Sequence, residues 1–105
     1  MISIIIPVYN QAKKLSLTLA SIARQSLSDW EVIVVNDGSS DNPEAVFADF
    51  CAQIKIDNRF IFLSQENQGA AAARNRGYQE ASGEYLFLCD ADADDELVVL
   101  LADVR

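Results

Sequence analysis

Apolar residues occur along this chain in two alternating patterns. Short runs of β-branched and aromatic residues are separated by longer segments in which apolar residues recur every three or four positions. The runs predict buried strands, and the recurrences predict amphipathic helices. The expected strands are residues 2–8, 31–35, 59–64 and 84–89. The expected helices are residues 12–25, 43–54, 67–83 and 96–104.

Several residues mark the expected helix boundaries. Asn10 can cap the first helix, and Asn42 followed by Pro43 is a favourable start for the second. Gly83 is expected to end the third helix in a left-handed cap. Strands and helices that alternate in this way predict an α/β fold, in which a mostly parallel sheet carries helices on both faces.

A polar cluster follows each expected strand. The clusters contain, in chain order, Tyr9 and Asn10, Asn36 and Asp37, Glu66 and Asn67, and Asp90 and Asp92. Ligands of parallel α/β sheets bind outside the carboxyl ends of the strands, so these loops predict one binding site at one edge. The loops at the opposite edge, residues 26–30 and 55–58, carry no comparable set.

Size and composition exclude several classes of function. The 105 residues suffice for one domain with a single core, and their net charge of −8 disfavours a nucleic-acid partner, because such binding depends on basic side chains. No apolar run approaches the roughly 20 residues of a membrane span, and no signal peptide is expected. The chain contains no His, which excludes Ser-His-Asp and Cys-His catalysis and His-ligated zinc. Cys51 and Cys89 are expected to be buried thiols, which fits a reducing cytoplasm.

The acidic cluster near the carboxyl end allows three interpretations. Asp90, Asp92 and Asp94 occupy the first, third and fifth positions of a calcium loop, but Asp95 and Leu101 stand where that loop needs Gly and Glu. A carboxylate pair at a strand end instead suits Mg²⁺ or Mn²⁺ shared with ligand phosphates. The last acidic residues of the cluster can also cap the amino end of a helix. A dinucleotide site or a P-loop is excluded, because no Gly follows the first strand.

Four segments together resemble the amino-terminal half of the family 2 glycosyltransferases. They are "SIIIPVYN" at residues 3–10, "WEVIVVNDGSSD" at 30–41, "NQGAAAARNRG" at 67–77 and "GEYLFLCDADADD" at 83–95. The family consists of inverting nucleotide-sugar enzymes with a Rossmann-like, GT-A-type donor-binding half. The resemblance implies metal-dependent transfer of a sugar, with a UDP-sugar as the expected donor, to a glycan or lipid-linked acceptor in cell-surface polysaccharide synthesis. It also implies Mn²⁺ or Mg²⁺ as cofactor, and a cytoplasmic enzyme or one peripheral to the inner face of the membrane.

The resemblance assigns roles to individual residues. Pro7, Val8 and Tyr9 match the segment that lines the nucleobase pocket, where an aromatic face can stack on the base. Asp37 matches the carboxylate that accepts a hydrogen bond from the base. Arg74 lies in an element near the nucleotide, where it can bind the ligand or anchor its loop by pairing with a carboxylate.

The acidic motif departs from the family pattern. Where the family has D-A-D-D, this chain has D-A-D-A-D-D. In one register, Asp90 lies near the ribose and Asp92 ligates the metal that bridges the diphosphate; we favour it because Asp90 directly follows the apolar run. In the other register, the pair is Asp92 and Asp94. A second departure is Asn36, where many members carry an aspartate.

The resemblance covers only the donor-binding half of the family. Residues 1–105 are therefore expected to form the nucleotide-sugar-binding portion of a glycosyltransferase domain, truncated before the acceptor-binding half. The carboxylate general base that an inverting transfer needs is expected beyond Arg105. We expect an active transferase as a longer protein and no transfer by this chain alone. The alternative is a stand-alone nucleotide-binding module without turnover.

Overall fold

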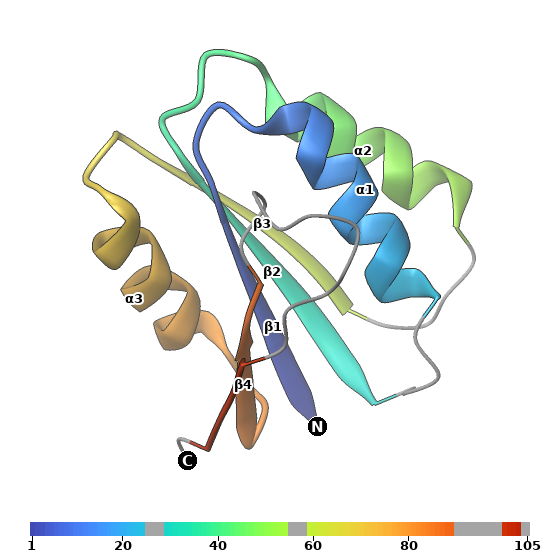
Figure 1. Ribbon diagram of the computed structural model, residues 1–105, viewed down its shortest axis with the longest axis vertical. Helices are drawn as coiled ribbons and strands as arrows, with labels where there is room; N and C mark the ends of the chain where they lie inside the picture. The colour runs from blue at the N-terminus through green and yellow to red at the C-terminus, as the bar shows by residue number, and fades with distance from the viewer. Residues whose placement is uncertain (25–28, 55–58, 90–99, 104–105) are drawn as a thin grey trace.

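The computed structural model describes residues 1–24, 29–54, 59–89 and 100–103. The sheet has five strands in the order β3-β2-β1-β4-β5. The strands are β1 (Ile2–Val8), β2 (Trp30–Asp37), β3 (Arg59–Gln65), β4 (Tyr85–Leu88) and β5 (Leu100–Asp103), and the helices are α1 (Ala12–Ala23), α2 (Pro43–Gln53) and α3 (Ala70–Glu80). The first four strands are parallel, β5 is antiparallel to β4, and α1 and α2 cover one face of the sheet while α3 covers the other (Figure 1). The predicted α/β class is confirmed.

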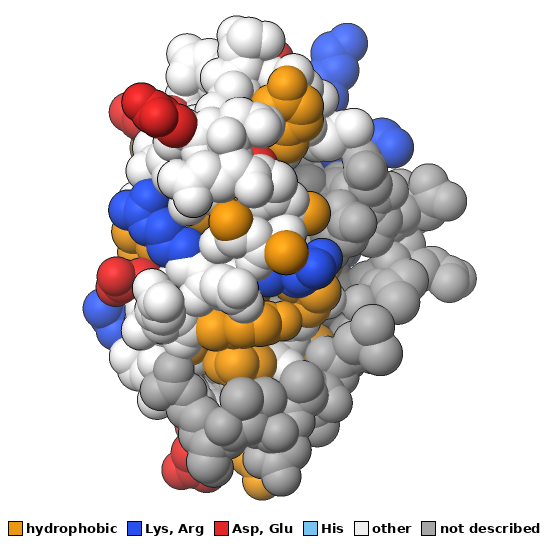
Figure 2. Space-filling model, turned by 90° about the vertical axis from the view of Figure 1, so that its left-hand side faces the viewer, with side chains coloured by type: hydrophobic (Ala, Val, Ile, Leu, Met, Phe, Trp, Pro, Cys, Tyr) orange, Lys and Arg blue, Asp and Glu red, His pale blue; other side chains and the backbone are white. Residues whose placement is uncertain are grey.

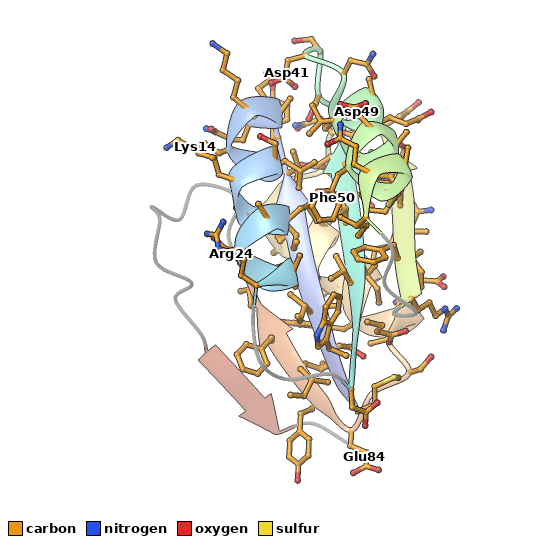
Figure 3. The ribbon with its side chains drawn as sticks, turned by 90° about the vertical axis from the view of Figure 1, so that its right-hand side faces the viewer. Lys14, Arg24, Asp41, Asp49, Phe50 and Glu84 are labelled. Atoms are coloured by element: carbon orange, nitrogen blue, oxygen red, sulfur yellow. The ribbon has the colours of Figure 1, made fainter. Side chains whose placement is uncertain are left out.

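The central strands β1 and β2 supply side chains to two core layers. Successive residues of a strand point to opposite faces, so their uninterrupted apolar runs fill both layers. The layer under α1 and α2 includes Ile4, Ile6, Leu15, Leu19, Ile22, Val32 and Val34. The layer under α3 includes Ile5, Ile33, Val35, Ala73 and Leu86. Phe50 of α2 points into the first layer (Figure 3), where its ring centroid lies 5.9 Å from that of Phe60.

The final predicted helix, residues 96–104, is wrong where the structure describes it. Leu100–Asp103 form β5, which pairs with β4 in antiparallel register. A short apolar run without a stop signal fits a strand as well as a helix, and pairing with β4 decides for the strand. The other residues of this prediction lie outside the described part of the chain.

Gly83 does not form the predicted left-handed helix cap. The helix α3 already ends at Glu80, Ala81 is extended, and Gly83 has no positive φ. The glycine is needed for a different reason, which is the close approach of this loop to β1. A Cβ atom on Gly83 would lie 2.6 Å from Ser3 Oγ and 2.7 Å from the Met1 carbonyl oxygen.

A buried polar network centred on Glu31 lies at the edge of the sheet opposite the predicted binding site. The Glu31 side chain is fully buried, and its carboxylate accepts hydrogen bonds from Ser3 Oγ at 2.6 Å, the Ser82 backbone N–H at 2.7 Å and Arg59 Nη1 at 3.2 Å. These partners compensate the cost of burying the charge. Glu31 was not predicted to be part of a polar network, because it lies inside an otherwise apolar strand and not in a loop.

The surface charge and the lengths of the helices bear on which partners the chain can bind. On the face covered by α3, positive and negative side chains of the described residues are interspersed with neutral ones and do not merge into one positive patch (Figure 2). The helix α1 has 12 residues, and α2 and α3 have 11 each. Within the described ranges, no helix has the length and apolar character that crossing a membrane requires.

Substitution of Gly83 tests the close approach to β1. We expect Gly83→Ala to lower the free energy of unfolding by about 1–3 kcal/mol, because the added methyl group overlaps Ser3 and the adjacent backbone. Urea unfolding followed by circular dichroism measures the difference. The control Ser82→Ala removes only the 3.1 Å hydrogen bond from Arg59 Nη1 and should cost less than about 1 kcal/mol. Equal losses in the two variants would contradict this explanation.

Candidate functional site

The loops that follow β1, β2 and β3 meet at the end of the sheet opposite the amino terminus (Figure 1). They border a pocket of about 400 Å³. The lining residues are Pro7, Val8, Tyr9 and Gln11 from the first segment, Asp37 from β2, Asn67, Gly69, Ala70, Ala73 and Arg74 from the third segment, and Leu88 from β4. The convergence predicted for these three loops is confirmed.

Five predicted site residues line this one pocket although the sequence separates them widely. They are Pro7, Val8, Tyr9, Asp37 and Arg74. The other two, Asp90 and Asp92, lie outside the described residues. They follow the pocket-lining residue Leu88 at a distance of only two and four positions along the chain.

Tyr9 presents a largely exposed aromatic ring at the pocket wall. The residue is 52% exposed, and within the described part of the chain it makes no hydrogen bond. A partly exposed aromatic ring beside a pocket is suited to stacking on a planar ligand group.

Asp37 anchors the segment that leads into α3. Its side chain is buried, and Oδ1 accepts hydrogen bonds from Gln65 Nε2 at 2.9 Å and the Gln68 N–H at 2.8 Å. Oδ2 accepts one from the Gly69 N–H at 3.0 Å. Burial alone raises the pKa of the Asp37 carboxyl, but these hydrogen bonds favour the charged form and place the pKa below its ordinary value of 3.8. No local pattern signals this anchoring role, because the partners are mostly backbone groups of another loop.

Gly38 lets the same two loops approach each other closely. Its φ is +76°, and a Cβ atom there would lie 2.7 Å from the Asn67 backbone nitrogen. Asn67 Nδ2 also donates to the Asp37 carbonyl at 3.1 Å. The loop after β2 therefore fixes the position of the loop after β3, and with it one wall of the pocket.

Two arginines of α3 have different surroundings. Arg76 donates from Nη1 to the Ser64 carbonyl at 2.7 Å and so ties α3 to β3. Arg74 lines the pocket, and within the described residues it makes no hydrogen bond or ion pair. The alternative in which Arg74 anchors its loop through a carboxylate has no supporting contact there, and its guanidinium remains available to a ligand.

Asn10 does not cap α1, and Asp41 performs this role. The residue preceding α1 is Gln11, which makes no side-chain cap, and the Ala12 N–H donates to Asp41 Oδ2 at 2.9 Å. Figure 3 shows Asp41 beside the first turn of α1. No local pattern marks Asp41 as a cap, because the helix that it caps precedes it in the chain. Asn42 caps α2 as predicted and accepts from the Ala45 N–H at 3.4 Å.

The described part of the pocket contains no cluster of metal-ligating side chains. Within that part, no group of three or more His, Cys, Asp or Glu side chains is arranged to hold a metal ion. The carboxylate of Asp37 is the acidic group among the lining residues, and its oxygens are engaged by the α3 segment. The metal ligand expected from the sequence, Asp92, lies outside the described residues.

Comparison with known proteins identifies the family. The sequence model of the family "Glycosyl transferase family 2" matches residues 3–96. The chain belongs to this family. The glycosyltransferase GlyG of Streptococcus pneumoniae is 41% identical over 93 residues, which are 88% of this chain and 30% of GlyG. The poly-beta-1,6-N-acetyl-D-glucosamine synthase of Staphylococcus aureus is 38% identical over 92 residues, which are 87% of this chain and 21% of that protein.

Solved glycosyltransferase structures share the fold. The mannosyltransferase PcManGT from Pyrobaculum calidifontis, in complex with GDP-Man and Mn²⁺, superposes with a TM-score of 0.82 at 29% identity. The alignment covers 88% of this chain and 27% of PcManGT. S. aureus TarS 1-349 in complex with UDP-GlcNAc gives a TM-score of 0.76 at 27% identity, covering 87% of this chain and 26% of TarS 1-349. The GT-A-type fold implied by the sequence is thereby confirmed, and the chain spans at most about a third of these relatives.

The folded protein should lose stability when Asp37 loses its charge. We expect Asp37→Asn to lower the free energy of unfolding by about 1–3 kcal/mol at pH 7, because its new amide group would meet the Gly69 N–H, donor against donor. The folded-state pKa of Asp37 is lowered, so its stabilising contribution is present well above pH 3.8 and is lost as the pH falls through the folded-state pKa. The difference between the two proteins should therefore shrink in acid.

Denaturant titrations between pH 7 and pH 3 measure this difference. Glu66→Gln is the matched control, because Glu66 is an exposed carboxylate of the same loop without a hydrogen bond among the described residues. It should change stability by less than about 0.5 kcal/mol across the range. A pH-independent loss in Asp37→Asn would show that the charge of Asp37 does not hold the loop.

Proposed function

We propose that this chain is the nucleotide-sugar-binding portion of an inverting, metal-dependent glycosyltransferase that acts on a glycan or lipid-linked acceptor in polysaccharide synthesis. The observation that carries the proposal is the pocket in which Tyr9, Asp37 and Arg74 come together, in a chain of glycosyl transferase family 2. The related proteins include a polysaccharide synthase, and two structural neighbours hold GDP-Man or UDP-GlcNAc. The reduced Cys51 and Cys89 fit a cytoplasmic site of action, in solution or at the inner face of the membrane.

The nucleobase binds between the residues of β1 and the end of β2 in this proposal. The exposed ring of Tyr9 stacks on the base, and Pro7 and Val8 form the floor beside it. Asp37 accepts a hydrogen bond from the base. Its Oδ2 atom accepts one hydrogen bond within the protein and retains capacity for another, whereas Oδ1 already accepts two. A UDP-sugar is the proposed donor.

The diphosphate lies towards α3 and the end of β4. Arg74 supplies a positive charge at the pocket wall. Asp90 is assigned to the ribose by the family resemblance. Asp92 holds the divalent ion, Mn²⁺ or Mg²⁺, which when bound would stabilise the negative charge of the departing diphosphate. Such hard cations take carboxylate oxygens, which fits the chemistry of these residues.

Sugar transfer needs groups that the donor pocket does not supply. An inverting transfer requires a base that takes the proton of the acceptor hydroxyl, and the pocket carboxylate of Asp37 is already engaged by the α3 segment. Because the chain covers at most about a third of its relatives, we propose that the base and the acceptor site lie in further parts of a longer protein. The chain itself is then expected to bind the donor without transfer.

Arg74 should contribute to binding of the diphosphate. We expect Arg74→Gln to weaken UDP binding roughly ten- to hundredfold, the effect of losing charge-assisted hydrogen bonds, and to leave uridine binding within about twofold. Isothermal calorimetry with each ligand measures both affinities. Arg76→Gln is the matched control, since it removes the same charge from a side chain that does not line the pocket. An equal effect of both variants on UDP would mean that only net charge matters.

The acidic motif should make nucleotide binding depend on manganese. Asp92→Asn keeps the size of the side chain and removes its charge, so we expect it to abolish the increase in UDP affinity that Mn²⁺ causes. Asp94→Asn should leave that increase within about threefold, an interaction below 1 kcal/mol. Calorimetric titrations with and without Mn²⁺ measure the effect. If Asp94→Asn is as damaging as Asp92→Asn and Asp90→Asn is mild, the pair is Asp92 and Asp94. If all three variants respond normally, the cluster does not bind the ion.

A further inference from the structure

The position of Tyr9 is not explained by its own side-chain contacts. The residue is 52% exposed, and its ring makes no hydrogen bond within the described residues. Packing therefore restrains it weakly, and the direction in which it points depends on the backbone on either side. A ring that stacks on a ligand must be held in place before binding, because ordering it during binding reduces the affinity.

One hydroxyl group contacts both peptide groups that flank Tyr9. Ser39, in the loop after β2, accepts a hydrogen bond from the Asn10 N–H at 3.0 Å. The same Oγ atom lies 3.4 Å from the Val8 carbonyl oxygen, to which it donates. The first distance is ordinary, and the second is long and corresponds to a weaker bond. Together they fix the peptide before Tyr9 and the peptide after it to a single atom of a neighbouring loop.

The residue after Tyr9 is held in an uncommon backbone conformation by the same loop. Asn10 has a φ of +53°, a region that non-glycine residues seldom occupy and that asparagine tolerates better than most. Its Oδ1 atom accepts from the Ser40 N–H at 2.8 Å and from Ser40 Oγ at 3.2 Å. The chain thus turns sharply after Tyr9, and the turn is secured by the loop from β2.

The serine itself is fixed to the strands of the sheet. The Ser39 N–H donates to Asn36 Oδ1 at 3.0 Å, and Asn36 Nδ2 lies 3.4 Å from Ser64 Oγ of β3. Asn36 is the position where many family members carry an aspartate, and here its amide both accepts and donates. The hydrogen bonds that hold the backbone on either side of Tyr9 are therefore connected, through Ser39 and Asn36, to β2 and β3.

We propose that Ser39 is a positioning residue for nucleotide binding, which acts by fixing Tyr9 at the pocket wall and does not itself touch the ligand. The proposal rests on the proposed function of the pocket. Ser39 does not line the pocket, whereas Tyr9 does. Loss of the Ser39 hydroxyl should consequently weaken the contribution of the base to the affinity and leave the contribution of the diphosphate unchanged.

The first measurement needs no ligand. Backbone ¹⁵N relaxation of the 105-residue chain reports the order parameters of the Tyr9 and Asn10 amides. In Ser39→Ala, they should fall from about 0.85, the value of rigid backbone, towards about 0.6, and Ser39→Thr, which keeps the hydroxyl, should restore them. Ser40→Ala is the control, because it removes one contact to Asn10 and keeps the shorter one from the backbone. Unchanged order parameters in Ser39→Ala would overturn the proposal whether or not the chain binds nucleotides.

The second measurement separates positioning from general damage. UDP and inorganic diphosphate, each with Mn²⁺, are titrated into the wild type, Ser39→Ala, Tyr9→Ala and the double variant. Ser39→Ala should weaken UDP binding about five- to tenfold and diphosphate binding less than about twofold. In the Tyr9→Ala background, it should have almost no further effect on UDP, because residues that act through each other are not additive. Additive losses, or an equal loss for diphosphate, would overturn the proposal. Failure of the wild type to bind either ligand would instead refute the proposed function of the pocket.

Discussion

The hydrogen bonds of the Asp37 carboxylate hold the candidate site together. Asp37 ends β2, and its three donors belong to the segment that leads from β3 into α3. This contact fixes the wall that carries Asn67, Gly69 and Arg74. The residues just after Asp37 bind the loop on the other side, where Tyr9 lies. One turn of chain at the end of β2 therefore determines the separation of the two pocket walls.

A second carboxylate of β2 holds the other end of α3. The helix fully buries only Ala73 and Gly77, and Tyr78 packs partly buried against the core layer beneath it. Asp37 binds the two residues before the helix, and Glu31 binds the Ser82 N–H just beyond it. Hydrogen bonds to charged groups are stronger than neutral ones. The helix that bears Arg74 is thus held at both ends by polar contacts from one strand, in addition to its apolar packing on the sheet.

Local sequence patterns predicted most of the strands and helices but not the contacts between residues distant in the chain. The β-branched runs predicted β1 and β2 closely, and Asn42 with Pro43 predicted the start of α2, because each of these signals lies within the element itself. Tyr9, Asp37 and Asn67 were expected at this edge and line the pocket, since parallel strands bring their carboxyl ends to one edge.

The predictions that failed depend on partners distant in the chain. Asp41 caps a helix that precedes it by about thirty residues, and Gly83 is needed because of its contact with Ser3. Residues 100–103 form a strand because the edge of β4 is open to them. In each case, the local pattern allowed two structures, and the tertiary contact selected one.

The strand order also determines when a nascent chain can complete its sheet. β1, β2 and β3 are neighbours in both sequence and space, so these three strands can pair once residue 65 has emerged from the ribosome. β4 comes after α3, yet it must pair with β1 at the centre of the sheet. Until then, β1 exposes an unpaired strand edge, which other chains can recognise. The interval between the emergence of β3 and that of β4 is consequently one in which aggregation competes with folding.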